Sequence, residues 1–461
     1  MNQDNASWLS RRSFLRIGGL SWGMLGMNLL TPLTSTQKLW AANPSNNKKM
    51  LVIFQRGGND GLNTVIPRGD ADYNTETRPT LYVPEAEAID SGNGFAQFHP
   101  RLEPLMELYN NRALNGVDGP GNLAVIHRVG YARQSRSHFD SQRYWENGMP
   151  GEGDVQEGAF YRFINRNYDL KSKDNAFLAA ALSGSQMVMF KGRNPLPNFS
   201  RSSDFAFRGS DEASAKLLGE SPVGNNKGSG LLGLYGSAAA SPEKIYRPLV
   251  YETGELLGAT MTTLQNAISA GDYQPTNGAE YPGGTFGRRL TEAAMLFKRT
   301  PVKFIGLNIG GWDTHAGQGQ LYGRHGNLLT NLSTGIQALS RDLADQWEDM
   351  VVLTMTEFGR TSAENGSRGT DHAEASVMFA AGGPIKGGVY NCDADSWNEG
   401  AMFERRGRYL SRRTDFRSVM GEVFVNHFGE SAQGLSEIFP GYEEAQADTP
   451  GDFAPLNFVR G

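Results

Sequence analysis

The sequence predicts an α/β fold in which a mostly parallel sheet carries helices on both faces. Three observations lead to this prediction: short apolar runs, helical patterns between them, and abundant glycine. The 57 glycines among 461 residues favour many tight loops over a helical bundle. The apolar runs are continuous rather than alternating, which is typical of strands buried on both faces of a sheet. They span residues 50–54, 123–127, 177–182, 302–309, 350–355 and 376–381.

Segments with helical periodicity lie between these runs, so strands and helices alternate along the chain. One segment carries leucine or isoleucine at every third or fourth position, which marks a single apolar helical face. Residues 249–268 and 286–298 show related patterns. The residues of the first segment are Leu328, Leu332, Ile336, Leu339 and Leu343.

Residues 42–461 are predicted to form one domain with a loop-rich insertion around residues 184–241. The insertion is rich in Gly, Pro, Asn and Ser and has little periodicity, so we expect a surface segment that could cap a site. The single cysteine, Cys392, excludes an internal disulfide framework. The fold must therefore be stabilised by its core.

The N-terminal segment, residues 1–41, has the pattern of a twin-arginine signal peptide. Arg11 and Arg12 stand directly before a weakly apolar stretch, residues 17–33, and small residues from Ala41 onward offer a cleavage site. We expect export by the twin-arginine translocase to the periplasm or the cell exterior, with no stable membrane span after cleavage. An uncleaved membrane-anchored helix is the alternative, although a span needs about 20 apolar residues.

The charge of the chain argues against nucleic acid as a partner. The net charge is −5, and it falls to about −8 without residues 1–41, because that segment holds four basic residues and one acidic residue. An acidic protein without a basic stripe lacks the electrostatic surface that attracts a phosphate backbone. We therefore expect no nucleic-acid partner.

Acidic and imidazole side chains cluster in the loops next to several predicted strands. In an open parallel sheet, ligands bind outside the carboxyl ends of the strands. Carboxylates with one or two imidazoles suit Zn, Mn, Mg or Ca, and neighbouring glycines allow close backbone approach. The sequence therefore predicts a site for one or two divalent ions. Its candidate ligands are Asp60, Asp313, His315, Glu357, Asp371 and His372.

Each candidate ligand has a simpler interpretation when it is taken alone. The glycine-rich segment around Asp60 could be a turn, because Asn, Asp and Gly tolerate positive φ. Asp313 could cap a helix, Glu357 could pair with Arg360, and Asp371 could be an exposed loop acid. The occurrence of all four at one sheet edge favours a binding site.

A second group of candidates surrounds Ser137. The spacing of Ser137 and Asp140 before a helical pattern is a capping box. A helix N-terminus also binds anions, so Ser137 or His138 could attack a phosphate or sulfate ester while Arg133 or Arg136 clamps its oxygens. The pattern fits two alternatives equally well: Ser137 only caps the helix, or it caps the helix and also takes part in catalysis.

Five motifs taken together resemble the exported domain-of-unknown-function 1501 family, over nearly all of the chain that remains after cleavage. A further motif, Thr-Asp-Phe-Arg at 414–417, is similar to the family's C-terminal signature. The family is in turn similar to the alkaline phosphatase and sulfatase superfamily. The five motifs are Arg-Gly-Gly-Asn-Asp-Gly-Leu at 56–62, Ser-Arg-Ser-His-Phe-Asp at 135–140, Gly-Trp-Asp-Thr-His at 311–315, Thr-Glu-Phe-Gly-Arg at 356–360 and Gly-Thr-Asp-His at 369–372.

The resemblance implies an alkaline-phosphatase-like fold with a two-metal site at the carboxyl edge of its sheet. Asp60 would be the ligand after the first strand, and Asp313 with His315 would be the aspartate–histidine pair of one metal. Glu357 would replace an aspartate after a later strand, and His372 would be the last histidine. The nucleophile would lie in the turn that opens the capped helix.

The chain departs from the superfamily at two points. Phe358 follows Glu357 where a second metal-binding histidine is usual, and Asp313 lies unusually close to His315 in the sequence. One metal site is therefore expected to be weakened, altered or lost.

These motifs lead to two functional hypotheses. The first is an exported metal-dependent hydrolase of phosphate or sulfate esters, in which Ser137 or His138 attacks and Arg56, Arg136 and Arg360 stabilise transition-state charge. The second is an exported non-catalytic binding or surface protein that keeps the fold, because fold alone does not determine function.

Overall fold

The computed structural model describes residues 47–110, 121–194, 196–205 and 246–460. The predicted signal peptide and most of the predicted insertion lie outside these ranges. Within them, no helix combines the length and the apolar character that a membrane crossing requires.

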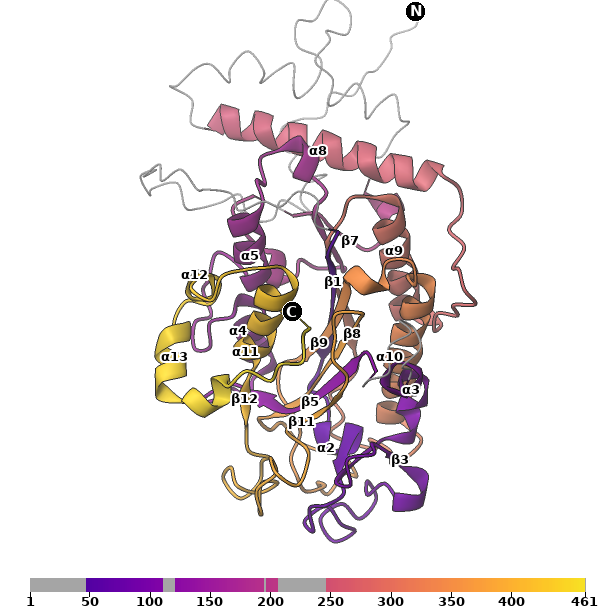
Figure 1. Ribbon diagram of the computed structural model, residues 1–461, viewed down its shortest axis with the longest axis vertical. Coiled ribbons are helices and arrows are strands. Elements are labelled where there is room, and N and C mark those ends of the chain that lie inside the picture. Colours follow the sequence, from indigo (N-terminus) through magenta and orange to yellow (C-terminus); the bar gives the residue numbers. More distant parts are fainter. Residues whose placement is uncertain (1–46, 111–120, 195, 206–245, 461) are drawn as a thin grey trace, which may run out of the picture.

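A nine-stranded sheet runs through the centre of the described fold (Figure 1). Its order is β11–β5–β10–β9–β1–β8–β6–β7, and β12 pairs with β5 off this path. All six predicted apolar runs form strands of this sheet, so the prediction of buried strands is confirmed. The bounds are β1 Lys49–Arg56, β5 Leu123–Gly130, β6 Ala179–Leu182, β7 Asn198–Phe199, β8 Phe304–Gly310, β9 Met350–Thr356, β10 Ser376–Ala381, β11 Gly388–Tyr390 and β12 Thr414–Asp415.

One strand of this sheet runs against the others. β10 is antiparallel to both β5 and β9, whereas the other strand pairs are parallel. The predicted mostly parallel sheet is thus confirmed, with β10 as its exception. Because β10 is reversed, the residues just before it, Asp371 and His372, lie at the carboxyl ends of β1, β8 and β9.

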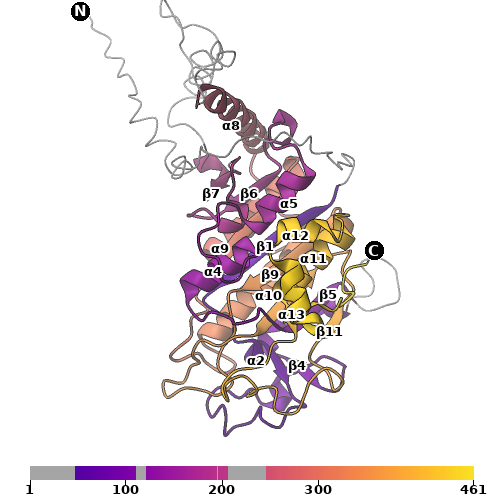
Figure 2. The same ribbon diagram turned by 90° about the vertical axis from the view of Figure 1, so that its left-hand side faces the viewer.

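Helices cover both faces of the sheet, as predicted, and they bury two separate apolar clusters (Figures 1 and 2). Successive residues of β1 point to opposite faces, so Leu51 belongs to one cluster and Val52 to the other. On the Leu51 side lie α3 (Met106–Asn110), α9 (Gly284–Arg299) and α10 (Arg324–Asp342). On the Val52 side lie α4 (His138–Asn147), α5 (Ala159–Asn167), α11 (Phe416–Glu422), α12 (Gly434–Ile438) and α13 (Tyr442–Asp448).

The remaining elements flank this sandwich. α8 (Tyr246–Ser269) lies across the top of Figure 1, and it matches the predicted helical segment 249–268. α2 (Gly61–Thr64) follows β1, and a small sheet contains β2 (Val65–Pro67), β4 (Ala96–Phe98) and β3 (Ile89–Asp90). A π-helical turn, Val423–His427, continues α11. Short 3-10 helices occur at Glu85–Glu87, Pro100–Leu105, Lys173–Asn175, Val188–Phe190, Ser202–Asp204 (η6), Trp347–Asp349 and Pro450–Phe453.

Candidate metal centre

The loops that follow β1 and β8 touch at the carboxyl edge of the sheet. Gly57 has a φ of +124°, and a Cβ at this position would lie 2.4 Å from the backbone nitrogen of Asp313. Only glycine allows both this conformation and this approach. The close contact fixes where the Asp313 loop stands relative to β1.

Three half-buried side chains converge at this edge: His138, Asp313 and His372. One ligand atom from each lies within 4.8 Å of the other two. His372 Nε2 is 3.1 Å from Asp313 Oδ1, and His138 Nε2 is 3.5 Å from Asp313 Oδ2. The side chains come from α4, from the loop after β8 and from the segment before β10. The three together could hold a metal ion.

His315 extends the cluster on the side of His372. Its Nε2 lies 2.9 Å from His372 Nε2 and 3.1 Å from Asp313 Oδ1, while its Nδ1 lies 3.0 Å from Asp371 Oδ1. Two imidazole nitrogens this close share a proton or a cation, because their lone pairs would otherwise repel. The structure therefore brings four of the six predicted ligands together, namely Asp313, His315, Asp371 and His372.

Glu357 contacts the cluster through His138. The side chain is fully buried, and its Oε1 accepts hydrogen bonds of 2.8 Å from Gly57 N, His138 Nδ1 and Gln142 Nε2. With Nδ1 donating to Glu357, His138 directs its Nε2 toward Asp313. His138 Nε2 and Glu357 Oε2 are buried without a hydrogen-bond partner in the described part of the chain.

This donor set fits a divalent transition metal. A histidine that ligates a metal through one ring nitrogen commonly donates a hydrogen bond from the other ring nitrogen to a carboxylate, as His138 does to Glu357. Several imidazoles with one carboxylate suit Zn or Mn better than Ca or Mg, which prefer oxygen ligands. The predicted role of Glu357 as a direct ligand stays a prediction, since its contact with His138 is made through Oε1 alone.

Neighbouring groups shift the ionisation of the cluster. The hydrogen bond that His138 donates to Glu357 raises the pKa of His138 above its usual value, against the effect of burial. Burial lowers the pKa of His372. Burial alone would raise the pKa of Asp313, but the hydrogen bond and the charge of Arg360 lower it well below its usual range. Asp313 is thus held as an anion at the centre of the cluster.

Arg360 supports the loops around the cluster. Its side chain is fully buried and donates to Asp313 Oδ1 at 2.5 Å. It also donates to the backbone carbonyls of Gly57, Gly58, Trp312 and Thr370. The predicted role of Arg360 in stabilising transition-state charge stays a prediction.

Arg56 is also engaged by the protein. It pairs with buried Glu146 at 2.6 Å and donates to Gln142 and Asn308. Its side chain is only 21% exposed. Arg56 therefore holds Gln142 in place beside Glu357, and its predicted role in stabilising transition-state charge stays a prediction.

Asp60, a predicted ligand, lies apart from the metal cluster. Its carboxylate forms a fully buried ion pair with Arg78, at 2.7 Å, and accepts a 2.6 Å hydrogen bond from Gln318. Gln318 in turn accepts from the hydroxyls of Thr314 and Thr370. None of the contacts of Asp60 is with a histidine or carboxylate of the cluster. Asp60 instead supports, through Gln318, the two loops that carry Asp313 and Asp371.

Ser137 is the N-cap of α4, as the sequence predicts. Its Oγ accepts from the backbone nitrogen of Asp140 at 3.4 Å, and the side chain is exposed. Arg136 adjoins it, with its backbone oxygen 2.9 Å from His372 Nδ1 and its guanidinium group 3.6 Å from Glu374. The cap is confirmed, and a chemical role for Ser137 stays a prediction.

The sequence analysis did not identify three residues that support this site, namely Gln142, Gln318 and Arg78. Gln142 lies four residues after His138 on the same helix, so helical spacing could have identified it. Gln318 and Arg78 reach Asp60 only through the folded chain, and no local pattern marks them.

Phe358, which follows Glu357 in the sequence, packs against two histidines of the cluster. Its fully buried ring lies 4.8 Å from the ring of His138 and 4.7 Å from that of His372, measured between centroids. The phenyl ring positions both imidazoles by packing and supplies no ligand atom.

The fold and this cluster define an α/β protein with a candidate metal centre at the carboxyl edge of its sheet. Residues 47–405 match the family described as "Protein of unknown function (DUF1501)", so the chain belongs to that family and the predicted membership is confirmed. No curated protein matches the chain.

Two solved structures similar to this chain are alkaline phosphatases. The enzyme from the Antarctic bacterium TAB5 is 9% identical, over 75% of this chain and 95% of that chain, with a TM-score of 0.30. A mutant of the TAB5 enzyme with Mg bound in its M3 site is 10% identical, over 74% and 94%, with a TM-score of 0.28. Similarity at this level assigns no activity to the chain.

Proposed function

We propose that this protein is an exported metal-dependent hydrolase of phosphate or sulfate esters. The observation that carries the proposal is the convergence of His138, His315 and His372 on the carboxylate of Asp313, with donor atoms 2.9–3.5 Å apart. A cluster of this composition on a rigid sheet edge is the usual setting of a catalytic metal.

The bound ion would be Zn or Mn, in one or two copies. His138, Asp313 and His372 would hold it, with His315 and Asp371 available for a second ion. A bound divalent cation polarises the ester oxygens and lowers the pKa of an attacking hydroxyl or water.

The residues around the cluster suit an anionic ester. Arg136 is one-third exposed and Arg408, 3.7 Å from Asp371, is 60% exposed, so both can reach a ligand at the cluster. Planar guanidinium groups bind phosphate and sulfate oxygens in pairs. The first turn of α4 adds backbone N–H groups and the positive end of the helix dipole.

Ser137 is our candidate nucleophile. Its hydroxyl is exposed at the helix N-terminus and directly precedes the candidate ligand His138. A serine hydroxyl needs an adjacent base or metal to react at neutral pH. Attack by His138 itself is the alternative, and it would compete with the ligand role of Nε2.

A second candidate function is an exported binding or surface protein without catalysis. Phe358 favours it, because this ring contacts the two imidazoles where a further ligand would otherwise stand. Such a protein would hold one ion, or none, and bind its ligand without turnover.

The test measures metal content of the purified protein and then turnover of aryl phosphates and aryl sulfates across a panel of metals. We expect Ser137→Ala and His138→Ala each to reduce hydrolysis by roughly a hundredfold or more. Ser137→Ala should keep most of the metal, whereas Asp313→Asn should lose metal and activity together. A folded wild type that binds at most one ion and hydrolyses neither ester class would favour the non-catalytic function.

A further inference from the structure

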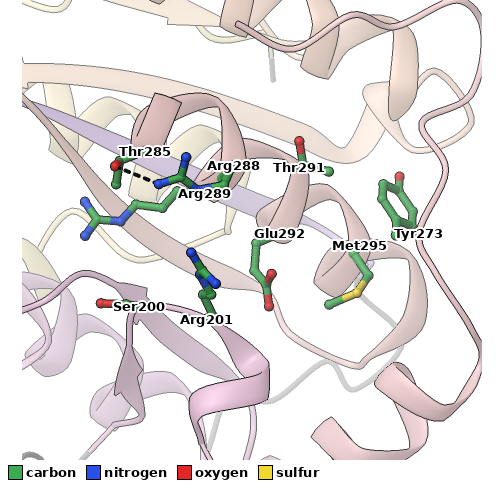
Figure 3. A pocket seen from close by; sticks show the side chains of 9 residues that line it. All are labelled: Ser200, Arg201, Tyr273, Thr285, Arg288, Arg289, Thr291, Glu292 and Met295. Carbon is green, nitrogen blue, oxygen red and sulfur yellow. Dashed lines mark hydrogen bonds between the residues drawn. The ribbon is translucent and has the colours of Figure 1, made fainter. Parts of the chain in front are cut away.

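A cavity of about 450 Å³ lies beside α9 and is lined by none of the metal-cluster residues (Figure 3). Ser200 and Arg201 line it from the end of β7 and the start of η6. The first half of α9 supplies most of the opposite wall, and Tyr273 comes from the segment before that helix. This size is within the range of pockets that bind small molecules.

Three arginines give the cavity an excess of positive charge among the described residues that line it. Figure 3 shows Arg201 extending toward α9, where Arg288 and Arg289 lie. Arg288 donates to the hydroxyl of Thr285 at 2.9 Å, and Arg289 has a buried Nε without a hydrogen-bond partner among the described residues. In the described ranges, no carboxylate forms an ion pair with any of the three.

The one acidic residue of the cavity is already engaged. Glu292 accepts from the backbone nitrogen of Ser202 at 2.7 Å, which holds η6 against α9. Three arginines against one glutamate leave the lining with a net charge of +2. Burial and the charge of the neighbouring Arg288 lower the pKa of Arg289.

The walls of the cavity differ between its two ends. α9 begins at Gly284, so Thr285 and Arg288 stand in its first turns, where the helix dipole favours an anion. Met295 and the ring of Tyr273 line the other end (Figure 3). One end therefore suits an oxyanion and the other an apolar group.

We propose that this cavity binds a small organic anion, with a phosphate or sulfate group on Arg201, Arg288 and Arg289 and an apolar part against Tyr273 and Met295. Guanidinium groups match the oxygens of phosphate and sulfate in paired hydrogen bonds. The site is separate from the metal centre and does not require catalysis there.

The test is calorimetric binding of phenyl phosphate to the metal-free protein at low salt, with phenol and inorganic phosphate as comparison probes. Removing the metal separates this site from any ester binding at the metal centre. We expect phenyl phosphate to bind, inorganic phosphate to bind more weakly, and phenol not to bind. Arg289→Gln and Arg201→Gln should each weaken phenyl phosphate binding about tenfold, because each removes charge-assisted hydrogen bonds.

Arg143→Gln is the matched control, since Arg143 is exposed on α4 and does not line the cavity. It should leave binding unchanged, and Arg289→Lys should restore part of the loss because it restores the charge. Circular dichroism checks that each variant is folded. Equal binding by the wild type and the Arg201→Gln/Arg289→Gln double variant would overturn the proposal. Tight binding of phenol, or no binding of phenyl phosphate to the wild type, would overturn it as well.

Discussion

His138 donates from Nδ1 to Glu357 Oε1 over 2.8 Å, and this bond directs its Nε2 toward Asp313. Oε1 accepts two further hydrogen bonds, from Gly57 N and Gln142 Nε2, which fix the position of this fully buried carboxyl group. Carboxylates in this relation fix the tautomer and orientation of a ligating imidazole. Glu357 therefore orients His138 in the candidate metal centre.

The first prediction is that Glu357→Gln lowers zinc affinity by about 10–100-fold, the usual cost of losing such a partner. The amide can no longer stabilise the Nδ1–H group of His138 with a negative charge. Zinc affinity is measured by competition with a chelator of known strength. Glu348→Gln, an exposed change just before the opposite end of β9, is the control. Unchanged affinity in Glu357→Gln would contradict this role.

The second prediction concerns the buried pair of Asp60 and Arg78. Asp60→Asn should lower the free energy of unfolding by about 3–5 kcal/mol, because it leaves a buried arginine without its counter-charge. The folded fraction of this variant should still bind zinc, because Asp60 contacts no residue of the metal cluster and asparagine keeps an oxygen that can accept from Gln318. Urea unfolding measures the first effect and zinc titration the second.

Arg78→Met should destabilise the protein to a similar extent, and the double variant with Asp60→Asn should recover part of the loss, because no charge is then buried alone. Loss of zinc binding by folded Asp60→Asn would instead restore Asp60 as a ligand, in agreement with the sequence-based prediction.

The strands and helices of this fold could be predicted well from the sequence. Strands buried on both faces need continuous apolar runs, and helices with one buried face need apolar residues at a period of 3.6. The antiparallel direction of β10 could not be predicted from the sequence, because an apolar run has the same pattern in a parallel and in an antiparallel strand. The direction of β10 determines the position of two candidate ligands, because it brings Asp371 and His372 to the edge where the other strands end.

The sequence identified many residues of the candidate site, but it did not show which groups each of them contacts. A carboxylate after a strand has the same local pattern whether it meets a metal or an arginine, and only the fold brings Arg78 to Asp60. The same limit applies to Arg360 and Glu357, which the motifs mark but whose burial and contacts appear only in three dimensions.

The third prediction concerns export, which rests on the paired Arg11 and Arg12 of the N-terminal segment. Changing both to lysine should leave an uncleaved precursor in the cytoplasm, because the twin-arginine translocase reads the arginine pair as an address. Fractionation and the size of the protein on a gel give the result. Normal processing of the double variant would refute this route.

The fourth prediction concerns acid stability and depends on His99 and His127, which are held neutral in the folded protein. His127 Nδ1 accepts from Arg128 N at 2.9 Å, so its Nε2, 3.0 Å from the carbonyl of Val65, must carry the proton. His99 likewise accepts at Nδ1 from Arg101 N. Burial lowers the pKa of each ring from 6.5 to about 4.

The sign of the effect follows from these pKa values. Below about pH 6.5 the unfolded chain protonates both histidines, whereas the folded protein does so only near pH 4, so stability is full above 6.5 and falls as the pH drops toward 4. Each ring contributes roughly 3 kcal/mol to this loss at the acid end. Urea unfolding between pH 7.5 and 4.5 should show the decline in the free energy of unfolding. His127→Gln keeps a donor for the carbonyl of Val65 but cannot titrate. This variant should therefore lose only about half of the free energy that the two histidines together contribute to the decline. An identical pH dependence in wild type and His127→Gln would show that His127 does not resist protonation in the folded state.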